Sequence, residues 1–262
     1  MSNDSVKKTL LVATLLCVFC SIMVSSSVVI LRPFQEENKT LDIRKNLLLA
    51  AGLIDNVSAS RDEINRAYEK IEVRMINIDS GEYVDHIDPA KFDAKKAAKD
   101  PKMNKRINSS KDAAGIKTRS IYSKIFFVKE NGLIDQIILP VYGKGLWSTM
   151  YGFLCLSSDR KTVKGFAFYD HGETPGLGGE VDNPRWKSLW PGKSVFDEKF
   201  NVIVDILKGS VNPGSKEVYR QVDGLAGATL TCNGVENLLH YWLGDDGFGP
   251  FLRNFSENGG NI

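Results

Sequence analysis

The chain has 262 residues, of which 42% are hydrophobic and 25% charged, so it can bury a core and is not a disordered or low-complexity sequence. Its 34 basic and 32 acidic residues leave a net charge of +2, which argues against a dedicated nucleic-acid-binding protein. Four cysteines are too few for a disulfide framework, and the scattered histidines His86, His171 and His240 argue against a metal site.

The first predicted element is an apolar helix over Thr9–Leu31, a stretch without any charged residue. At about 1.5 Å per residue, this helix is long enough to cross a bilayer core of about 30 Å. Lys7 and Lys8 precede the stretch and only Arg32 follows it closely, so the positive-inside rule predicts a cytoplasmic N-terminus and an extracytoplasmic main part. A cleaved signal peptide is the competing interpretation, but the run is longer than an ordinary signal core, and we expect a retained anchor.

Residues 33–120 are predicted to be a helical and lysine-rich segment. Ser60 and Glu63 predict a capping box at the start of a helix. Four apolar residues then have the spacing of one helical face, namely Ile64, Ala67, Ile71 and Met75. Residues 85–120 lose this periodicity and are rich in lysine, and we interpret them as a solvated, mobile insertion. The alternative is a docking surface for an acidic partner or anionic lipid.

From residue 121 onward the sequence predicts short strands and a final helix, an order typical of an α+β fold. The expected strands are Ile121–Val128, Leu133–Val141, Gly152–Leu156, Val163–Tyr169 and Val202–Leu207. The helix is expected over Asn233–Leu243, capped by Asn233 and Glu236, with three side chains facing the core: Leu238, Leu239 and Trp242. Cys155 and Cys232 could form a disulfide in an exported domain, but the sequence does not show that they are close.

The stretch Asp223–Thr231, directly before this helix, is the first candidate ligand site. Gly227 and Ala228 let the backbone approach a ligand closely, and Thr229 offers a hydroxyl that could carry a phosphate. Free N–H groups and the positive dipole end of the helix would hold the phosphate's charge. The alternative is an ordinary tight turn in which Thr231 is the N-cap of the helix.

Two further loops are candidate sites. Gly172–Glu180 is rich in glycine and follows a predicted strand, but it is neither a Walker A motif nor a dinucleotide fingerprint. His171 and Glu173 could be an acid/base pair, although a solvated loop pair is the simpler interpretation. In the loop Gly143–Ser148, Trp147 could stack on an aromatic ring and Lys144 could meet an anion; the alternative is a Trp147 packed in the core. No hydrolase motif is present.

Four sequence blocks behind the apolar run resemble a known family. They are GKGLWSTMYGF, HGETPGLGGEV, VDGLAGATLTCNGVENLLHYWLG and DDGFGPFL, in this order. The pattern resembles the NqrC family, whose members are parts of the sodium-translocating NADH:quinone reductases. It is similar, less closely, to the related flavoproteins of Rnf-type electron-transport complexes and to FMN-binding domains in general. The resemblance covers residues 120–255 and the anchor, and it is poor in the lysine-rich insertion of residues 85–120.

In that family, FMN is joined through its phosphate to the threonine hydroxyl of a (Ser/Thr)-Gly-Ala-Thr motif, which the match places at Thr229. A separate flavin transferase makes the bond, so Thr229 is an attachment point and the resemblance implies no catalytic residue. Ala226 stands where the family usually has Ser or Thr, while Asp223, which opens the motif, is present. The remaining FMN contacts that we expect are Gly227, Ala228, Glu173, Thr174, Gly176, Leu177 and Trp147.

The resemblance implies one transmembrane helix followed by an extracytoplasmic FMN-binding domain of mixed sheet and helix. The expected parts are a cytoplasmic stub and anchor over 1–32, the lysine-rich segment over 33–120 and the FMN-binding domain over 121–262. The implied function is electron transfer through covalent FMN in a complex of the bacterial inner membrane that couples NADH oxidation and ubiquinone reduction to sodium export. NADH itself would bind elsewhere, since no dinucleotide fingerprint is present.

The partners that we expect are other integral membrane subunits, the flavin transferase and the membrane, and no nucleic acid. Three alternatives stay open: an electron carrier of an Rnf-type complex, a stand-alone membrane flavoprotein reductase, and a non-redox assembly module.

Overall fold

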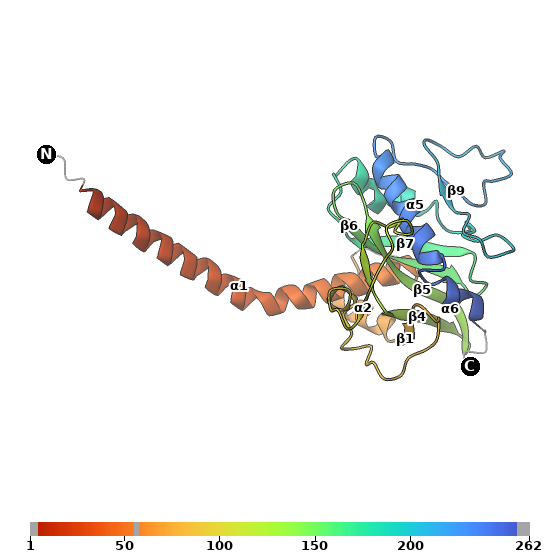
Figure 1. The fold of residues 1–262 in the computed structure, drawn as a ribbon, viewed down its shortest axis with the longest axis horizontal. Coiled ribbons are helices and arrows are strands. Elements are labelled where there is room, and N and C mark those ends of the chain that lie inside the picture. Colours follow the sequence, from red (N-terminus) through yellow and green to blue (C-terminus); the bar gives the residue numbers. More distant parts are fainter. Residues whose placement is uncertain (1–4, 55–57, 256–262) are drawn as a thin grey trace. The chain divides into compact units, whose positions relative to one another are not determined.

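The computed structural model describes residues 5–54 and 58–255, and the chain forms two compact units, Met1–Ile43 and Arg44–Ile262 (Figure 1). Helix α1 (Val6–Ala50) begins in the first unit and ends in the second. Among the described residues it is the one helix long and apolar enough to cross a membrane, and its apolar window is not buried by the protein. The predicted apolar helix is therefore confirmed, and it continues well beyond the predicted end.

Helix α2 (Arg61–Tyr68) starts with the predicted capping box, in which the Glu63 carboxylate accepts a 2.7 Å hydrogen bond from the Ser60 amide. The predicted helical face is wrong after Tyr68, however, because Ile71 and Met75 lie in strand β1 (Ile71–Asn77). A spacing of four residues fits a helical face, but it also fits one face of a strand, where side chains repeat every two residues. Antiparallel pairing with strand β4 (Tyr122–Glu130) makes this segment a strand rather than a helix.

A five-stranded antiparallel sheet in the order β1-β4-β5-β6-β7 forms the centre of the second unit. Its later strands confirm four predicted strands and continue past their predicted C-terminal ends, although β4 begins one residue later than predicted. They are β4 (Tyr122–Glu130), β5 (Leu133–Lys144), β6 (Thr149–Ser157) and β7 (Val163–Asp170). Of the predicted strand Val202–Leu207, only β8 (Asp205–Ile206) is a strand, and it pairs in parallel with β9 (Gln221–Val222). The α+β prediction is confirmed.

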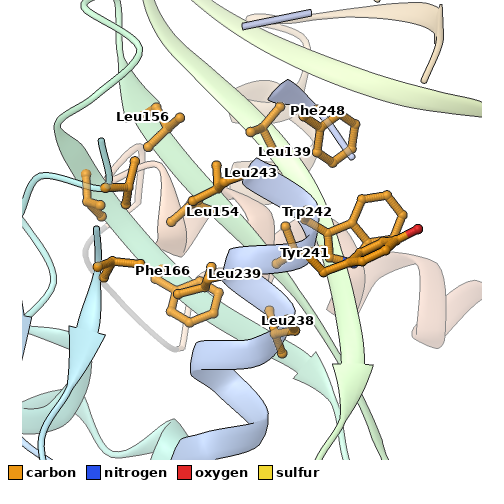
Figure 2. Packing of buried hydrophobic residues seen from close by; sticks show 14 of the residues in the cluster. Leu139, Leu154, Leu156, Phe166, Leu238, Leu239, Tyr241, Trp242, Leu243 and Phe248 are labelled. Atoms are coloured by element: carbon orange, nitrogen blue, oxygen red, sulfur yellow. The ribbon is translucent and has the colours of Figure 1, made fainter. Parts of the chain in front are cut away.

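The two faces of the sheet are covered by different helices. On β5, Leu139 and Val141 join the core cluster that contains α5 (Thr229–Leu243), including Leu238, Leu239 and Trp242 as predicted (Figure 2). Gln136 has the opposite parity along the same strand, and its amide nitrogen donates to the Ala51 carbonyl just after α1. Since alternate residues point to opposite faces, α5 and the end of α1 lie on opposite faces of the sheet.

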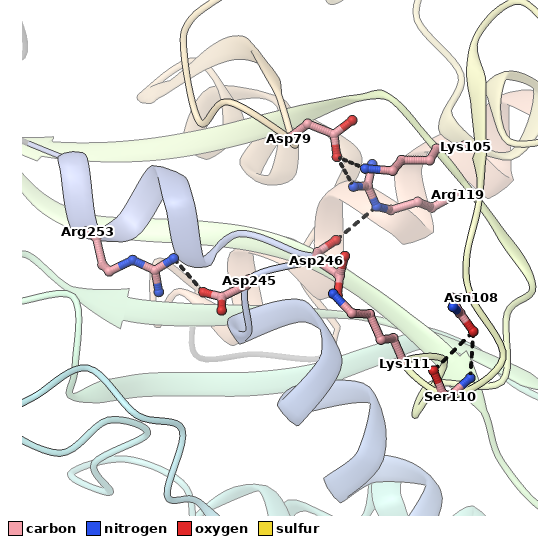
Figure 3. Close-up of polar contacts among 9 residues, drawn as sticks. All are labelled: Asp79, Lys105, Asn108, Ser110, Lys111, Arg119, Asp245, Asp246 and Arg253. Carbon is pink, nitrogen blue, oxygen red and sulfur yellow. Dashed lines mark hydrogen bonds and ion pairs between the residues drawn. The ribbon is translucent and has the colours of Figure 1, made fainter.

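The lysine-rich insertion of residues 85–120 is folded onto this unit, so the prediction that it is mobile is wrong. It forms α3 (Ala94–Ala97), β2 (Asn104–Arg106) and β3 (Thr118–Ser120), and β2 pairs with β3. The Arg119 guanidinium, 1% exposed, forms an ion pair with Asp79 and donates to the Asp246 carbonyl at 2.9 Å (Figure 3). A buried cation tied to two distant segments fixes the segment in place, whatever the exposure of its lysines.

The remaining described helices of the second unit are short: η1 (Gly178–Asp182), α4 (Pro184–Lys187) and α6 (Gly249–Asn254). Cys155 and Cys232 are buried free thiols, so the disulfide left open by the sequence is not formed. Strand β1 comes from the segment 33–120 and pairs with β4 of the segment 121–262. The division into 1–32, 33–120 and 121–262 remains a proposal.

Candidate functional site

Helix α5 begins at Thr229, four residues earlier than predicted. Its N-cap is Ala228, and within the described residues no side chain caps it. The predicted caps are wrong: Asn233 and Thr231 lie inside the helix, and the Glu236 carboxylate instead accepts a 2.7 Å hydrogen bond from the Ile206 amide. The first turn of α5 thus presents backbone N–H groups that have no intrahelical acceptor, the usual setting for an anion.

The two threonines of this turn have opposite environments. Thr229 is exposed at the first position of the helix, whereas Thr231 is 1% exposed. Two residues turn a helix by about 200°, so the two hydroxyls lie on opposite sides. Thr231 Oγ1 donates to Glu173 Oε2 at 2.7 Å. Thr229 is therefore the threonine whose hydroxyl is accessible for modification.

Glu173 joins three segments of the chain. Besides Thr231, its carboxylate accepts hydrogen bonds from three consecutive backbone amides of the β5–β6 loop: Leu146 at 3.2 Å, Trp147 at 3.0 Å and Ser148 at 3.2 Å. Burial opposes ionisation of Glu173, but the hydrogen bonds from Thr231 and the three amides outweigh it and hold the pKa of this carboxyl below its usual value. The predicted solvated pair with His171 is wrong, because Glu173 is only 5% exposed.

His171 has another partner. Its Nε2 lies 2.8 Å from Asp182 Oδ2, and its Nδ1 accepts a 3.2 Å hydrogen bond from the Glu173 backbone amide. None of these hydrogen bonds joins the imidazole to the Glu173 carboxylate, so the two side chains are not a hydrogen-bonded acid/base pair. His171 instead fixes the backbone at the start of the glycine-rich loop.

Glycines let these segments approach closely. A Cβ on Gly145 would lie 2.6 Å from Glu173 Oε1, and one on Gly178 would lie 2.5 Å from Thr231 Oγ1. Gly227 has a φ of +72°, and a Cβ there would lie 3.0 Å from Leu177 Cδ2. The turn before α5 and the glycine-rich loop are thus in contact beside Thr229.

Large apolar side chains on these same segments are exposed. They form what we call the apolar rim, which consists of Leu146, Trp147, Leu177 and Leu230. Trp147 is 66% exposed, so the alternative of core packing for this residue is wrong. An exposed aromatic ring, on segments that also expose aliphatic side chains, is suited to cover a planar ligand.

Other predicted contacts have structural partners. The Asp223 carboxylate accepts a 2.7 Å hydrogen bond from the Val211 amide, and its backbone carbonyl accepts one from the Trp186 indole. Thr174 is exposed, and its carbonyl accepts the amides of Leu177 and Gly179 in the loop. Gly176, with a φ of +77°, has open space around it, and Ala228 is buried. No group of metal-binding side chains is found among the residues described.

Comparison with known proteins places the chain in a family. Residues 145–244 match the family model described as "FMN-binding domain". The chain is 48% identical to the NqrC protein of the Na(+)-translocating NADH-quinone reductase of Pseudomonas aeruginosa over 257 residues, 98% of each chain. It is 43% identical to that of Yersinia pestis, over 98% of this chain and 95% of the relative. The chain belongs to the NqrC family of Na(+)-translocating NADH-quinone reductases.

The fold agrees with this membership. The crystal structure of Shewanella oneidensis NqrC superposes with a TM-score of 0.75 at 34% identity, over 83% of this chain and 97% of that chain. The resemblance to the NqrC family in the sequence blocks is thereby confirmed. The FMN-binding match of this family member includes Trp147, Glu173 and Thr229, and Glu173 links the loop that carries Trp147 to the first turn of α5, which begins at Thr229.

Sequence reasoning missed the role of Thr231 in this member of the NqrC family. The sequence suggests a helix cap, whereas Thr231 is the buried partner of Glu173. Extending the helix back to Thr229 would have placed the two threonines on opposite faces, so the signal was present. The three amides of the β5–β6 loop carried no such signal, because a backbone donor can belong to any residue type.

Proposed function

We propose that this chain is the FMN carrier of a sodium-translocating NADH:quinone reductase, with the FMN phosphate esterified to Thr229. The observation that carries the proposal is an exposed threonine at the first position of a helix without a side-chain cap, inside the FMN-binding match. The complex and the reaction in this proposal are those that the names of the relatives state. Other integral membrane subunits would be its partners in the bacterial inner membrane.

The residues present fit the flavin. Amides of the first turn of α5 would bind the phosphate, with Gly227 and Ala228 forming the turn that leads to it. The apolar rim would cover the isoalloxazine through Trp147 and Leu177. Thr174 and Gly176 would line the exposed loop, while Asp223 would brace the turn through its bond to Val211. When bound, FMN supplies electron transfer, and the protein positions it and excludes water from part of the ring.

Attachment would make the Thr229 hydroxyl an ester. Thr229 Oγ1 forms a bond to the flavin phosphorus and loses its proton, while that phosphorus loses its bond to a second phosphate. A donor of the flavin dinucleotide class meets this balance, because a nucleoside monophosphate leaves. A separate flavin transferase would catalyse the step, and this chain would contribute the acceptor.

The complex would couple NADH oxidation and ubiquinone reduction to sodium export, with this chain carrying electrons between other subunits. No dinucleotide fingerprint occurs in its sequence, so NADH would bind elsewhere in the complex. We also propose that residues before α1 lie in the cytoplasm and the sheet domain in the periplasm, as the lysines before the apolar run favour.

The test is the Thr229→Val variant, coexpressed with the flavin transferase. On a denaturing gel under ultraviolet light, the wild-type band should fluoresce and the Thr229→Val band should be dark, because valine has no hydroxyl to esterify. Intact mass should show the flavin phosphate adduct on the wild-type chain alone.

The matched control is Thr231→Val, which removes the neighbouring hydroxyl of the same motif. Its band should still fluoresce, because Thr231 is buried and points to Glu173. A fluorescent Thr229→Val band, or a wild-type chain with the unmodified mass, would contradict the proposed attachment.

A further inference from the structure

We propose that Glu173 is a positioning residue that ties the loop of Trp147 to the first turn of α5, the helix that starts at the flavin attachment point, rather than a residue that contacts the flavin. The flavin part of this inference rests on the proposed function. The part that concerns the loop rests on the contacts of the chain alone.

The first argument is that the Glu173 carboxylate has no acceptor capacity left for a ligand. Oε1 accepts the amides of Trp147 and Ser148, and Oε2 accepts the Leu146 amide and the Thr231 hydroxyl. An ionised carboxylate offers about four lone-pair sites, and all four are used within the protein. A side chain with 5% exposure and all its acceptor sites filled does not recognise a flavin directly.

The second argument is the shape of the β5–β6 loop. Three consecutive backbone amides, those of residues 146–148, point at one carboxylate, and such a concave set of N–H groups binds an anion. Glu173 is the anion that fills it, and its pKa is lowered, in keeping with these bonds to the charged form. Without the carboxylate, these three amides would lose their common acceptor. The hydrogen bonds that hold the loop in its curved conformation would then be lost.

The third argument concerns Trp147 itself. Its backbone amide is held by Glu173 at 3.0 Å, while its side chain is 66% exposed. The other three tryptophans are each at most 4% exposed, in the core: Trp186, Trp190 and Trp242. The structure therefore fixes the backbone of Trp147 but leaves its ring outside the core. This arrangement is expected of an aromatic side chain that stacks on a planar ligand.

The fourth argument links this loop to the attachment residue. Thr231 is bonded to the same carboxylate and lies two residues after Thr229. On the other side, Leu177 of the glycine-rich loop reaches the position where a Gly227 Cβ would be, at 3.0 Å. Trp147, Leu177 and Thr229 are thus placed by segments that all meet at Glu173.

The first experiment compares Glu173→Gln with wild type as full-length, flavin-free chains in detergent, expressed without the flavin transferase. Hydrogen exchange should be about tenfold or more faster in a peptide that covers residues 145–150, because bonds from three amides to a charged acceptor are weakened or lost. The matched control is Glu180→Gln, since the Glu180 carboxylate accepts from the Asn183 side chain and not from this loop. Unchanged exchange in Glu173→Gln would overturn the proposal.

The second experiment uses flavin-loaded chains that contain 5-fluorotryptophan. The fluorine resonance of Trp147, assigned with Trp147→Phe, should shift on flavin attachment in wild type and Glu180→Gln, and this shift should be lost or strongly reduced in Glu173→Gln. Among these three chains, only Glu173→Gln should show a changed flavin reduction potential. If loop exchange rises but the resonance and the potential keep their wild-type values, Glu173 is only structural and the proposal is overturned.

A second variant keeps the test decisive if Glu173→Gln does not fold. Thr231→Val removes one of the four bonds and leaves the three amides bonded, so it should give the same changes at smaller size. Failure of the proposed function has a different signature: a wild-type chain that never acquires flavin overturns the attachment, while the exchange experiment still decides whether Glu173 positions the loop.

Discussion

At the scale of single residues, the site depends on one backbone conformation that other amino acids rarely adopt. Gly227 has a φ of +72° and lies immediately before Ala228, the N-cap of α5. The turn at Gly227 leads into the helix, whose first residue, Thr229, is exposed to solvent. An L-residue in this region costs roughly 1–2 kcal/mol. Gly176, on the neighbouring loop, has nearly the same φ of +77° but nothing within 4 Å of its Cβ position.

These two glycines allow a matched prediction. Gly227→Ala and Gly176→Ala should each lower the free energy of unfolding by about 1 kcal/mol through the backbone. Gly227→Ala should also reduce covalent flavin incorporation, because its new methyl group meets Leu177 Cδ2 at 3.0 Å, while Gly176→Ala has no such contact. The measurements are denaturant unfolding in detergent and the ratio of flavin absorbance to protein. Equal incorporation by the two variants would show that the contact with Leu177 is unimportant.

At the scale of elements, strands and helices that carry their own pattern were predictable, and those decided by partners were not. The strands β4 to β7 are rich in Ile, Val, Leu and Phe, so their positions followed from the sequence. The α2–β1 boundary did not, because Ile71 and Met75 suit a strand as well as a helix. The start of α5 was missed because its N-cap is an alanine, whereas capping rules search for a polar side chain.

The candidate site divides in the same way. Thr229 and the glycine-rich loop could be proposed from sequence, since the resemblance rests on their side chains. The position of Glu173 inside the protein could not, because its partners are mainly backbone amides of a loop some 25 residues earlier in the chain. Burial of Arg119 was equally hidden, since a lysine-rich stretch gives no hint that one of its cations has a partner in Asp79.

The close contact between β7 and the end of α1 predicts a substitution that lowers stability without affecting flavin attachment. A Cβ on Gly165 of β7 would lie 2.0 Å from the Ala50 carbonyl oxygen at the end of α1. Gly165→Ala should therefore destabilise the domain by about 1–3 kcal/mol and raise hydrogen exchange over residues 44–51, because the backbone of α1 must move away. Flavin attachment should persist, since α5 covers the other face of the sheet. Gly214→Ala, whose Cβ would meet only Asn212 Oδ1 at 3.4 Å, is the control and should leave both quantities near wild type.

At the scale of the whole molecule, the chain combines a helix whose apolar stretch is not buried by the described residues with a domain that has its own core. Such a helix is stable in a bilayer, where its backbone groups are satisfied internally and its side chains meet lipid. Lys7 and Lys8 before the apolar run then favour one orientation, with the domain on the far side of the membrane. For a flavoprotein, that orientation makes a covalent bond useful, because dissociated cofactor would be lost from the periplasm.

Cysteine labelling in spheroplasts tests this orientation. Cys155 and Cys232 are buried, and burial raises the pKa of both thiols, so they should not react with a membrane-impermeant maleimide at neutral pH. With Cys17 and Cys20 replaced by serine, a cysteine introduced at exposed Ser210 should react in intact spheroplasts. One introduced at exposed Ser5 should react only after the membrane is permeabilised. The reverse pattern would place the sheet domain in the cytoplasm, and labelling of neither position after permeabilisation would show that the two sites are covered in the assembled complex.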